Sequence, residues 1–188
     1  MSINYETCKV SNCSLCDISL HRTKIVSGNG NLQSNIMLIG EAPGKSEDQY
    51  GFPFIGESGI MLRKLMRSYG MEPKDFYITN TVKCRPPSNR RPSHTEISNC
   101  ISYLVYEIFK VNPILIVLLG NTAFKTIFPN SLYTINKVRG KLLISGGRIY
   151  LPTYHPSYVL RNKDNNEIKE EFNFDIKLLY YLTRLIYS

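Results

Sequence analysis

The sequence has no apolar run long enough to cross a membrane. A membrane-spanning helix needs roughly 18 or more apolar residues in a row, and no segment of the chain reaches that length. Its N-terminus, Met1 to Lys9, also lacks the basic region and the apolar stretch of an export signal. We therefore expect a soluble, intracellular protein with no membrane partner.

The chain also has no internal repeat and no low-complexity linker that would separate two domains. Hydrophobic residues make up 43% of its 188 residues, which is enough for one sizeable core. We therefore expect residues 1–188 to form a single domain.

The five cysteines are an odd number, and without an export signal they argue against a disulfide framework. Cys13 and Cys16 form a C-x-x-C chelating pair, and Cys84 and Cys100 follow with 15 residues between them. Four such thiolates could hold a [4Fe-4S] cluster or a structural zinc ion, or they could simply be buried thiols. A zinc ribbon normally uses two close pairs, so the wide second pair favours the cluster. Cys8 is left as a spare thiol.

Acidic residues are the minority among the charged ones. There are 23 Lys and Arg against 15 Asp and Glu, which gives a net charge of +8 and favours a polyanionic partner such as nucleic acid. The lysines are spread along the chain, however, so the excess could equally serve solubility. Specific motifs must decide between these interpretations.

Short apolar runs alternate with amphipathic helical patterns. The runs are typical of buried strands and cover 36–39, 76–79, 114–119 and 149–153. Helical spacing of apolar residues marks 62–69, 97–108 and 172–186, and Ser93 with Glu96 forms a capping box before the second of these. This alternation predicts an α/β fold, a three-layer α/β/α sandwich around a mostly parallel, four-stranded sheet.

Polar side chains follow the ends of the predicted strands. Glu41 comes shortly after the first strand, Asn80 directly follows the second, and His155 follows the last. In an open parallel sheet, ligands bind beyond the carboxyl ends of the strands. These three side chains can therefore converge on one site although they lie far apart in the sequence.

Five motifs stand in an informative order. They are Cys13-x-x-Cys16, Gly40-Glu41-Ala42-Pro43-Gly44, Phe52-Pro53-Phe54-Ile55-Gly56-x-x-Gly59, Thr79 to Pro87 with Asn89-Arg90, and Tyr154-His155-Pro156-Ser157. Together they resemble the motifs of the family-four, iron-sulfur uracil-DNA glycosylases, over roughly Cys13 to Asn173. The resemblance implies a base-excision repair enzyme that flips uracil out of single- or double-stranded DNA and hydrolyses its bond to deoxyribose.

The resemblance also bears on the cysteines. It implies that Cys13, Cys16, Cys84 and Cys100 are the four ligands of a [4Fe-4S] cluster. We expect this cluster to be structural, because hydrolysis of a glycosidic bond needs no electron.

A pocket for the flipped base is implied as well. Phe54 would stack on the uracil ring, and Asn80 would pair with uracil N3–H and O4, a pattern that cytosine reverses. Glu47 would fill the space beside C5 and reject the methyl group of thymine, although a Glu at this position could equally cap the following turn. Ala42, in the first glycine-containing motif, would line the same pocket.

His155 and Glu41 are the expected catalytic residues. His155 would donate a hydrogen bond to uracil O2 as the departing base gains negative charge. Glu41 would orient or deprotonate the attacking water, or it would only hold its own loop. No lysine in the matched motifs stands at a nucleophile position, so we expect a monofunctional enzyme that leaves an abasic site.

Two segments are expected to contact DNA. In the first, Val159 or Leu160 would fill the gap left by the flipped nucleotide, and Ser157 and Arg161 would lie near the backbone. The second is a proline-stiffened basic loop that contains Arg85, Pro86, Pro87 and Arg90. This second loop could equally be an ordinary solvated surface loop.

Three other interpretations remain open. The chain could be a related glycosylase that also removes deaminated purines, a non-catalytic iron-sulfur DNA-binding module, or a zinc-binding nucleotide or redox protein. The intact set of Glu41, Phe54, Asn80 and His155 argues against the second. We expect a monomer that is cytoplasmic or associated with the nucleoid.

Overall fold

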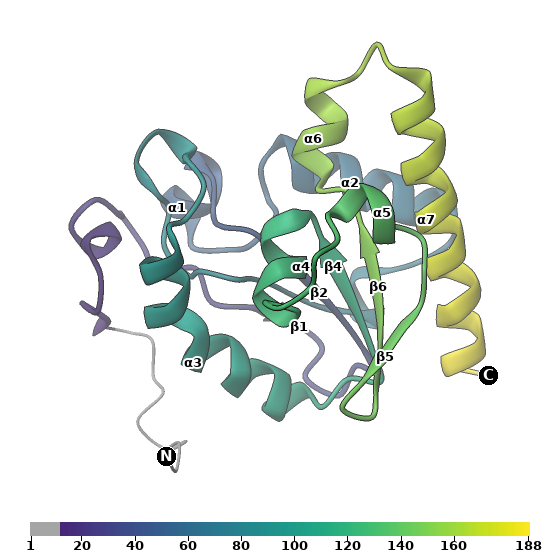
Figure 1. The fold of residues 1–188 in the computed structure, drawn as a ribbon, viewed down its shortest axis with the longest axis horizontal. Helices are drawn as coiled ribbons and strands as arrows, with labels where there is room; N and C mark the ends of the chain where they lie inside the picture. Colours follow the sequence, from purple (N-terminus) through teal and green to yellow (C-terminus); the bar gives the residue numbers. More distant parts are fainter. Residues whose placement is uncertain (1–11) are drawn as a thin grey trace.

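A computed structural model describes residues 12–188, so Cys8 lies outside the described residues. The sheet has six strands in the order β1-β3-β2-β4-β6-β5 (Figure 1). Its inner strands are parallel to one another and comprise β3 (Tyr77–Asn80), β2 (Ile36–Gly40), β4 (Leu115–Leu119) and β6 (Arg148–Thr153). These are the predicted strands, and their pairing confirms the α/β class.

Two further strands extend the sheet beyond the expected number. They are β1 (Asn29–Gly30) and β5 (Leu143–Ser145), and each pairs antiparallel with an edge of the parallel set. Both are very short and mostly exposed, so their residues show no apolar pattern that predicts a strand.

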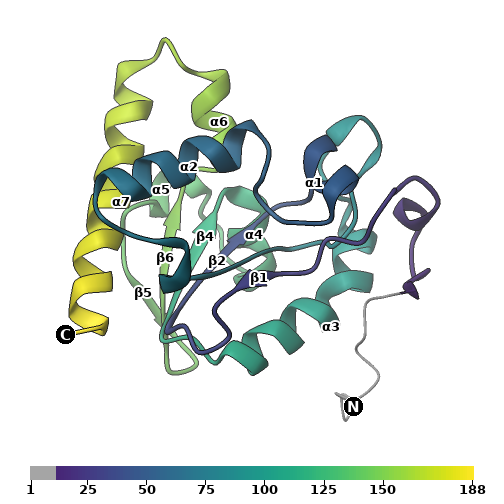
Figure 2. The ribbon, with the colours of Figure 1, turned by 180° about the vertical axis from the view of Figure 1, so that it is seen from behind.

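Helices cover both faces of the sheet, as the opposite views in Figures 1 and 2 show. On one face lie α2 (Glu57–Ser68), α6 (Pro156–Arg161) and α7 (Asn166–Ile186), which bury Leu62, Val159 and Phe172 against β2, β4 and β6. On the other face lie α3 (His94–Val111), α4 (Asn121–Ile127) and α5 (Ile135–Val138), which bury Leu104, Phe124 and Val138. The three-layer prediction is therefore confirmed.

The three amphipathic patterns correspond to α2, α3 and α7, whereas the shorter helices have weaker signals. These shorter elements include α1 (Lys45–Tyr50) and the 3-10 turns η3 (Asp17–Leu20), η4 (Pro73–Asp75) and η5 (Pro87–Asn89). Within residues 12–188, no helix is long and apolar enough to span a membrane.

The long α3 begins where the capping box predicts. Ser93 Oγ accepts a hydrogen bond from Glu96 N at 3.2 Å, and Ser93 N donates to Glu96 Oε2 at 2.7 Å. Two of the otherwise unpaired amides at the helix start are thus satisfied.

The parallel strands end at one edge of the sheet, and the backbone there is closely packed. Gly120, directly after β4, has φ +91°, and a Cβ at this position would lie 2.8 Å from His155 Cβ. Glycine is required both by the positive φ and by this approach. The ends of β4 and β6 therefore lie close enough to build one site.

Candidate active site

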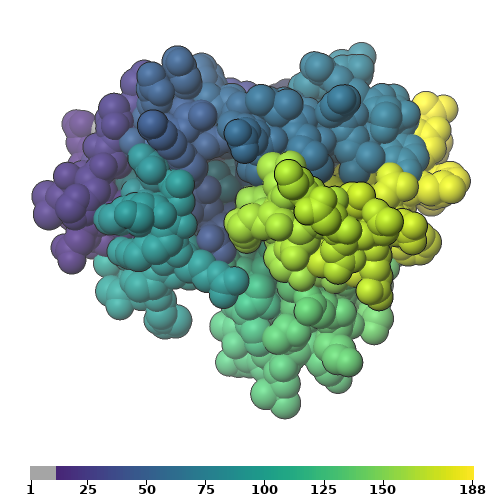
Figure 3. Space-filling model, turned by 90° about the horizontal axis from the view of Figure 1, so that it is seen from above, coloured from purple at the N-terminus to yellow at the C-terminus, as the bar shows by residue number. Residues whose placement is uncertain are grey.

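A cleft of about 890 Å³ opens at the carboxyl edge of the sheet. Figure 3 looks onto this edge and shows the surface hollowed between the teal segment that contains 86–91 and the yellow-green segment that contains α6. The cleft collects eleven of the predicted site residues: Glu41, Ala42, Glu47, Phe54, Asn80, Pro86, Arg90, His155, Ser157, Leu160 and Arg161. Arg85, Pro87 and Val159 do not line it.

Asn80 is the last residue of β3 and is almost completely buried, at 2% exposure. Its backbone carbonyl accepts a hydrogen bond from Lys83 Nζ at 2.7 Å, which fixes the strand end. Its side-chain Oδ1, in contrast, is buried without a hydrogen-bond partner in the described part of the chain. A buried acceptor left unpaired costs about 1–3 kcal/mol, so this atom is suited to a ligand that carries a donor.

Phe54 lies beside Asn80 with a strained backbone. Its φ is +57°, a conformation that side-chain-bearing residues rarely adopt and that is often found at functional sites. A Cβ on Gly40 would lie 2.5 Å from both Asn80 Oδ1 and Phe54 Cζ, so the two side chains close over the same small space. Arg63 donates a hydrogen bond to the Phe54 carbonyl and holds the loop in place.

His155 is also close to Phe54, since the centroids of the two rings are 6.0 Å apart. It caps α6, because its Nδ1 accepts a hydrogen bond from Ser157 N at 3.1 Å. Burial, together with the positive charge of Arg161, lowers the pKa of His155 to about 4. The ring is therefore neutral at pH 7, and its single proton resides on Nε2, because Nδ1 must accept.

Glu41 faces the cleft from the loop after β2 and is half-buried. Its Oε2 accepts a hydrogen bond from Thr122 Oγ1, at the start of α4. We had not predicted a role for Thr122, although it belongs to the polar segment that follows β4. Its contact orients the Glu41 carboxylate from a third strand end.

Glu47 is buried in the third position of α1 and ties two loops together. Its Oε2 accepts from Gly44 N at 3.0 Å, and its Oε1 accepts from Gly56 N at 2.7 Å. The capping alternative for this residue is therefore correct. The same carboxylate also lines the cleft, so capping does not remove it from the site.

The arginine side chains at the edge of the cleft form hydrogen bonds with other residues of the protein. Arg90 binds Glu96 through both guanidinium nitrogens, at 2.6 and 2.8 Å, and this bonding lowers the pKa of Glu96 to about 2. Arg85 Nε donates to Asn89 Oδ1 at 2.7 Å, whereas Arg161 is exposed and donates to Ser157 Oγ at 3.3 Å.

The four predicted cysteine ligands line a second, small cavity. Cys13 and Cys16 come from the N-terminal segment, and Cys84 and Cys100 are buried after β3 and in α3. Lys83 N donates to Cys100 Sγ at 3.3 Å, and Arg22 Nη1 donates to Cys84 Sγ at 3.5 Å. Burial raises the pKa of the Cys100 thiol to about 11. Among residues 12–188, no group of three or more His, Cys, Asp or Glu side chains is arranged to hold a metal ion.

Lys83 belongs to a motif noted in the sequence, but no role had been predicted for it. Its side chain is 1% exposed, and Nζ contacts Thr79 Oγ1 at 2.7 Å and Glu107 Oε2 at 2.6 Å as well as the Asn80 carbonyl. No local sequence signal exists for such a buried lysine, because Lys83 follows β3 and its partner Glu107 lies far along the chain, on α3.

Comparisons with known proteins agree with this geometry. The Uracil DNA glycosylase superfamily matches residues 27–177. The chain is 44% identical to a Type-4 uracil-DNA glycosylase of Thermotoga maritima over 158 residues, 84% of this chain and 82% of that one. It is 37% identical to the Type-4 enzyme of Archaeoglobus fulgidus, over 90% of this chain and 87% of that one. The Type-4 enzyme of Sulfurisphaera tokodaii is 40% identical, over 87% of this chain and 78% of that one.

Proposed function

The chain belongs to the Uracil DNA glycosylase superfamily, and within it to the Type-4 enzymes, and from this premise we propose that it excises uracil from DNA. The reaction is hydrolysis of the N-glycosidic bond of a flipped-out deoxyuridine, the first step of base-excision repair. The observation that carries the proposal is the unpaired, buried Oδ1 of Asn80, a residue that lines the cleft together with Phe54.

Asn80 reads the base. Its Oδ1 accepts from uracil N3–H and its amide group donates to O4, so a bound uracil satisfies the buried acceptor. Cytosine carries an acceptor at N3 and an amino group at C4, and it would leave buried polar groups unpaired. Sites of this kind discriminate by about 10⁴-fold or more. Phe54 stacks on the ring and offsets part of the unstacking cost of base flipping.

Glu47 excludes thymine. Two backbone amides hold its buried carboxylate, so the side chain cannot swing aside to admit a methyl group at C5. Capping and steric exclusion are then two consequences of one fixed position. Ala42 lines the pocket from the loop after β2.

His155 stabilises the departing base. Its neutral ring donates Nε2–H to uracil O2, where negative charge develops as the glycosidic bond breaks. The loss of one such donor typically lowers the rate by about 10² to 10³.

Glu41 orients the attacking water. One of its oxygens is held by Thr122, which leaves the other to bind a water molecule on the cleft side. Proton transfer to a correctly placed base contributes roughly 10² to 10⁴ to the rate. The product is an abasic site in an intact strand, because no lysine in the matched motifs stands at a nucleophile position.

DNA binds across the cleft, and α6 enters the space that the flipped nucleotide leaves in the duplex. Val159 is buried in the core, so Leu160 fills the space left by the flipped nucleotide, and Val159 anchors the helix. Ser157 and Arg161 contact the backbone beside it. The opposite side of the DNA-binding surface is the basic loop that contains Arg85, Pro86, Pro87 and Arg90. Glu96 holds the guanidinium of Arg90 in place there.

Cys13, Cys16, Cys84 and Cys100 would hold a [4Fe-4S] cluster. The four thiols line one cavity, and Arg22 and Lys83 supply hydrogen bonds to two of the sulfurs. In such a cluster each of the four thiolates would bind a different iron. With a bound cluster these cysteines would cross-link the N-terminal segment to α3, and hydrolysis of the glycosidic bond would need no electron from it.

The test is base release from a panel of labelled oligonucleotides that carry uracil, thymine, cytosine, hypoxanthine or xanthine. Alkali-dependent scission at uracil alone supports the proposal. Equal scission at hypoxanthine or xanthine would show instead that the chain is a glycosylase with a wider range of substrate bases. DNA binding with no scission at any base would point to a non-catalytic module.

A further inference from the structure

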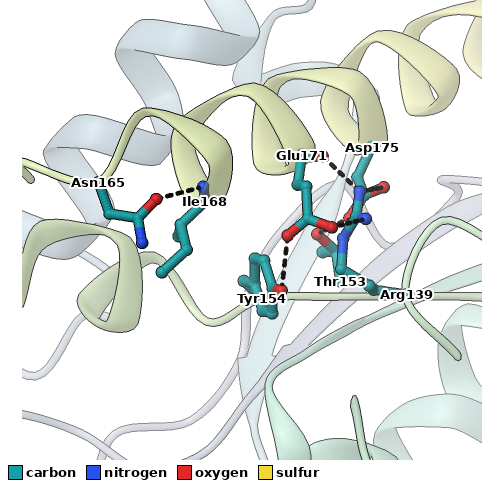
Figure 4. Close-up of polar contacts among 7 residues, drawn as sticks. All are labelled: Arg139, Thr153, Tyr154, Asn165, Ile168, Glu171 and Asp175. Carbon is teal, nitrogen blue, oxygen red and sulfur yellow. Dashed lines mark hydrogen bonds and ion pairs between the residues drawn. The ribbon is translucent and has the colours of Figure 1, made fainter. Parts of the chain in front are cut away.

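The two residues before His155 are tied to α7 by a buried polar network, which Figure 4 shows. Thr153 ends β6 and Tyr154 follows it, so both directly precede the loop that carries His155. Their partners are Asp175 and Glu171 on α7, and Arg139 at the end of α5 joins the two carboxylates.

Asp175 is the deeper of the two carboxylates and has no exposure to solvent. Its Oδ2 accepts from Thr153 Oγ1 at 2.6 Å and from Arg139 Nε at 3.0 Å, and its Oδ1 accepts from Arg139 Nη2 at 2.5 Å. Burial raises the pKa of Asp175, and the bonds from Thr153 and Arg139 oppose this rise. The paired guanidinium keeps the carboxylate in a fixed geometry.

Glu171 extends the network to the residue adjoining His155. Tyr154 OH donates to its Oε2 at 2.7 Å, and Arg139 Nη1 donates to its Oε1 at 2.9 Å. Burial and the bond to Glu171 raise the pKa of Tyr154 well above its usual range, so the hydroxyl stays a donor. The Arg139 guanidinium also lies 5.4 Å from the centroid of the Tyr154 ring, which completes a cage around this side chain.

The backbone of the same segment is held from both sides. Gly120 N donates to the Thr153 carbonyl and Gly140 N donates to the Pro152 carbonyl, each at 2.9 Å. With the strand fixed by these bonds and both side chains fixed by α7, the position of His155 is determined before any DNA binds.

A buried ionic network is a poor source of stability in itself. Removing charges from water is expensive, and well-packed apolar residues of the same volume often stabilise as much or more. Such a network instead fixes the positions of its members, and two of them, Thr153 and Tyr154, directly precede His155. Arg139, Glu171 and Asp175 do not line the cleft, whereas Tyr154 lines it and donates its hydroxyl to Glu171 on α7.

We propose that Arg139, Glu171 and Tyr154 are positioning residues for His155, which set where its Nε2–H meets the departing base. This proposal rests on the leaving-group role of His155 given above. A misplacement of about 1 Å at a reacting group can lower a rate by roughly 100-fold, so loosening the network slows bond cleavage without weakening DNA binding.

Tyr154→Phe is the informative variant, because it deletes one hydroxyl and keeps the ring. Glu171 is partly exposed, so water can replace the lost donor and the fold is preserved. Tyr69→Phe is the matched control: its hydroxyl donates to Asn173 on the same helix at 2.9 Å, far from His155 in the chain and outside the cleft. We expect Tyr154→Phe to lower the single-turnover rate on uracil-containing DNA about tenfold, with unchanged affinity for DNA, and Tyr69→Phe to leave both unchanged.

A double-mutant cycle with His155→Gln separates positioning from any other effect. If Tyr154 acts through His155, Tyr154→Phe causes no further loss of rate in the His155→Gln background. The same tenfold loss in both backgrounds, or no loss in either, would overturn the proposal.

Nitrogen NMR of His155 gives a readout that does not depend on activity. We expect one neutral tautomer with its proton on Nε2 in the wild type and in Tyr69→Phe, and a shifted or divided signal in Tyr154→Phe. Identical His155 signals in all three proteins would contradict positioning even if the wild type excised uracil. A wild type that excises no uracil but shows the expected NMR change would instead remove only the proposed function.

Discussion

Lys83 Nζ lies 2.6 Å from Glu107 Oε2, and this buried ion pair supports the strand end that carries Asn80. Glu107 in turn accepts from Gly28 N at 2.8 Å and from Thr79 Oγ1 at 2.6 Å. The backbone of Lys83 donates to Cys100 Sγ. One residue therefore connects the base-reading strand to the cysteine cavity.

Lys83→Met is predicted to destabilise the protein by about 3–5 kcal/mol, because it leaves the Glu107 carboxylate buried and unpaired. Urea unfolding measures this loss. The double variant Lys83→Met/Glu107→Met should recover most of the stability, since no uncompensated charge remains. A single-variant loss below about 1 kcal/mol would mean that the pair is not buried as described.

The pH dependence of His155 provides a second prediction. Its pKa is about 4 in the folded protein, against an ordinary value of about 6.5. Between pH 6.5 and pH 4, His155 is protonated in the unfolded chain but neutral in the folded protein. The free energy of unfolding is therefore not reduced by His155 above pH 6.5, and it decreases as the pH falls toward 4.

The same shift predicts that His155 stays neutral throughout the physiological range. An NMR titration of the ring should give a midpoint near 4, and Arg161→Gln should move it upward, because the positive charge of Arg161 helps to lower the pKa. A midpoint close to 6.5 in the wild type would show that the ring is protonated too easily to act as described.

Neighbouring residues of α6 should respond in different ways to truncation. Val159→Ala removes a buried side chain, so it should lower the free energy of unfolding by roughly 1–3 kcal/mol. Leu160→Ala should leave stability almost unchanged but slow excision from double-stranded DNA more than from single-stranded DNA, since only a duplex leaves a gap to fill. The reverse pattern would make Val159 the wedge.

The cysteine cavity is tested by elemental analysis of the purified protein. Four irons and four sulfides per chain are expected in the wild type and in Cys8→Ala, and both should be lost in Cys100→Ala. Unfolding of Cys100→Ala at a lower temperature would confirm a structural role. Stoichiometric zinc in protein purified from iron-replete cells would contradict the cluster.

The parallel sheet was predictable because each of its strands is a continuous apolar run that alternates with an amphipathic helix. Strands β1 and β5 were not predictable, because they are strands only through their pairing with an edge of the parallel sheet. The pattern of their own residues does not indicate a strand. The convergence of Glu41, Asn80 and His155 followed from the strand ends alone. The positive φ of Phe54 and the burial of Lys83 depend on contacts between distant segments, which no local pattern reports.

Arg139, which lies outside the cleft lining, illustrates the same limit. The sequence around it shows only a basic residue before Gly140, whereas its function depends on two carboxylates of α7, at positions 171 and 175. Glu47 is a case where both sequence interpretations were compatible, because capping of α1 is what fixes its carboxylate in the cleft.

The most direct test of the account is the single-turnover rate of Asn80→Ala on an oligonucleotide with one uracil, compared with the wild type at equal folded concentration. The substitution removes the whole carboxamide and with it the buried Oδ1, so we predict a loss of at least about 100-fold in rate together with weaker inhibition by free uracil, at nearly unchanged thermal stability. A variant that excises uracil as fast as the wild type would show that Asn80 does not read the base.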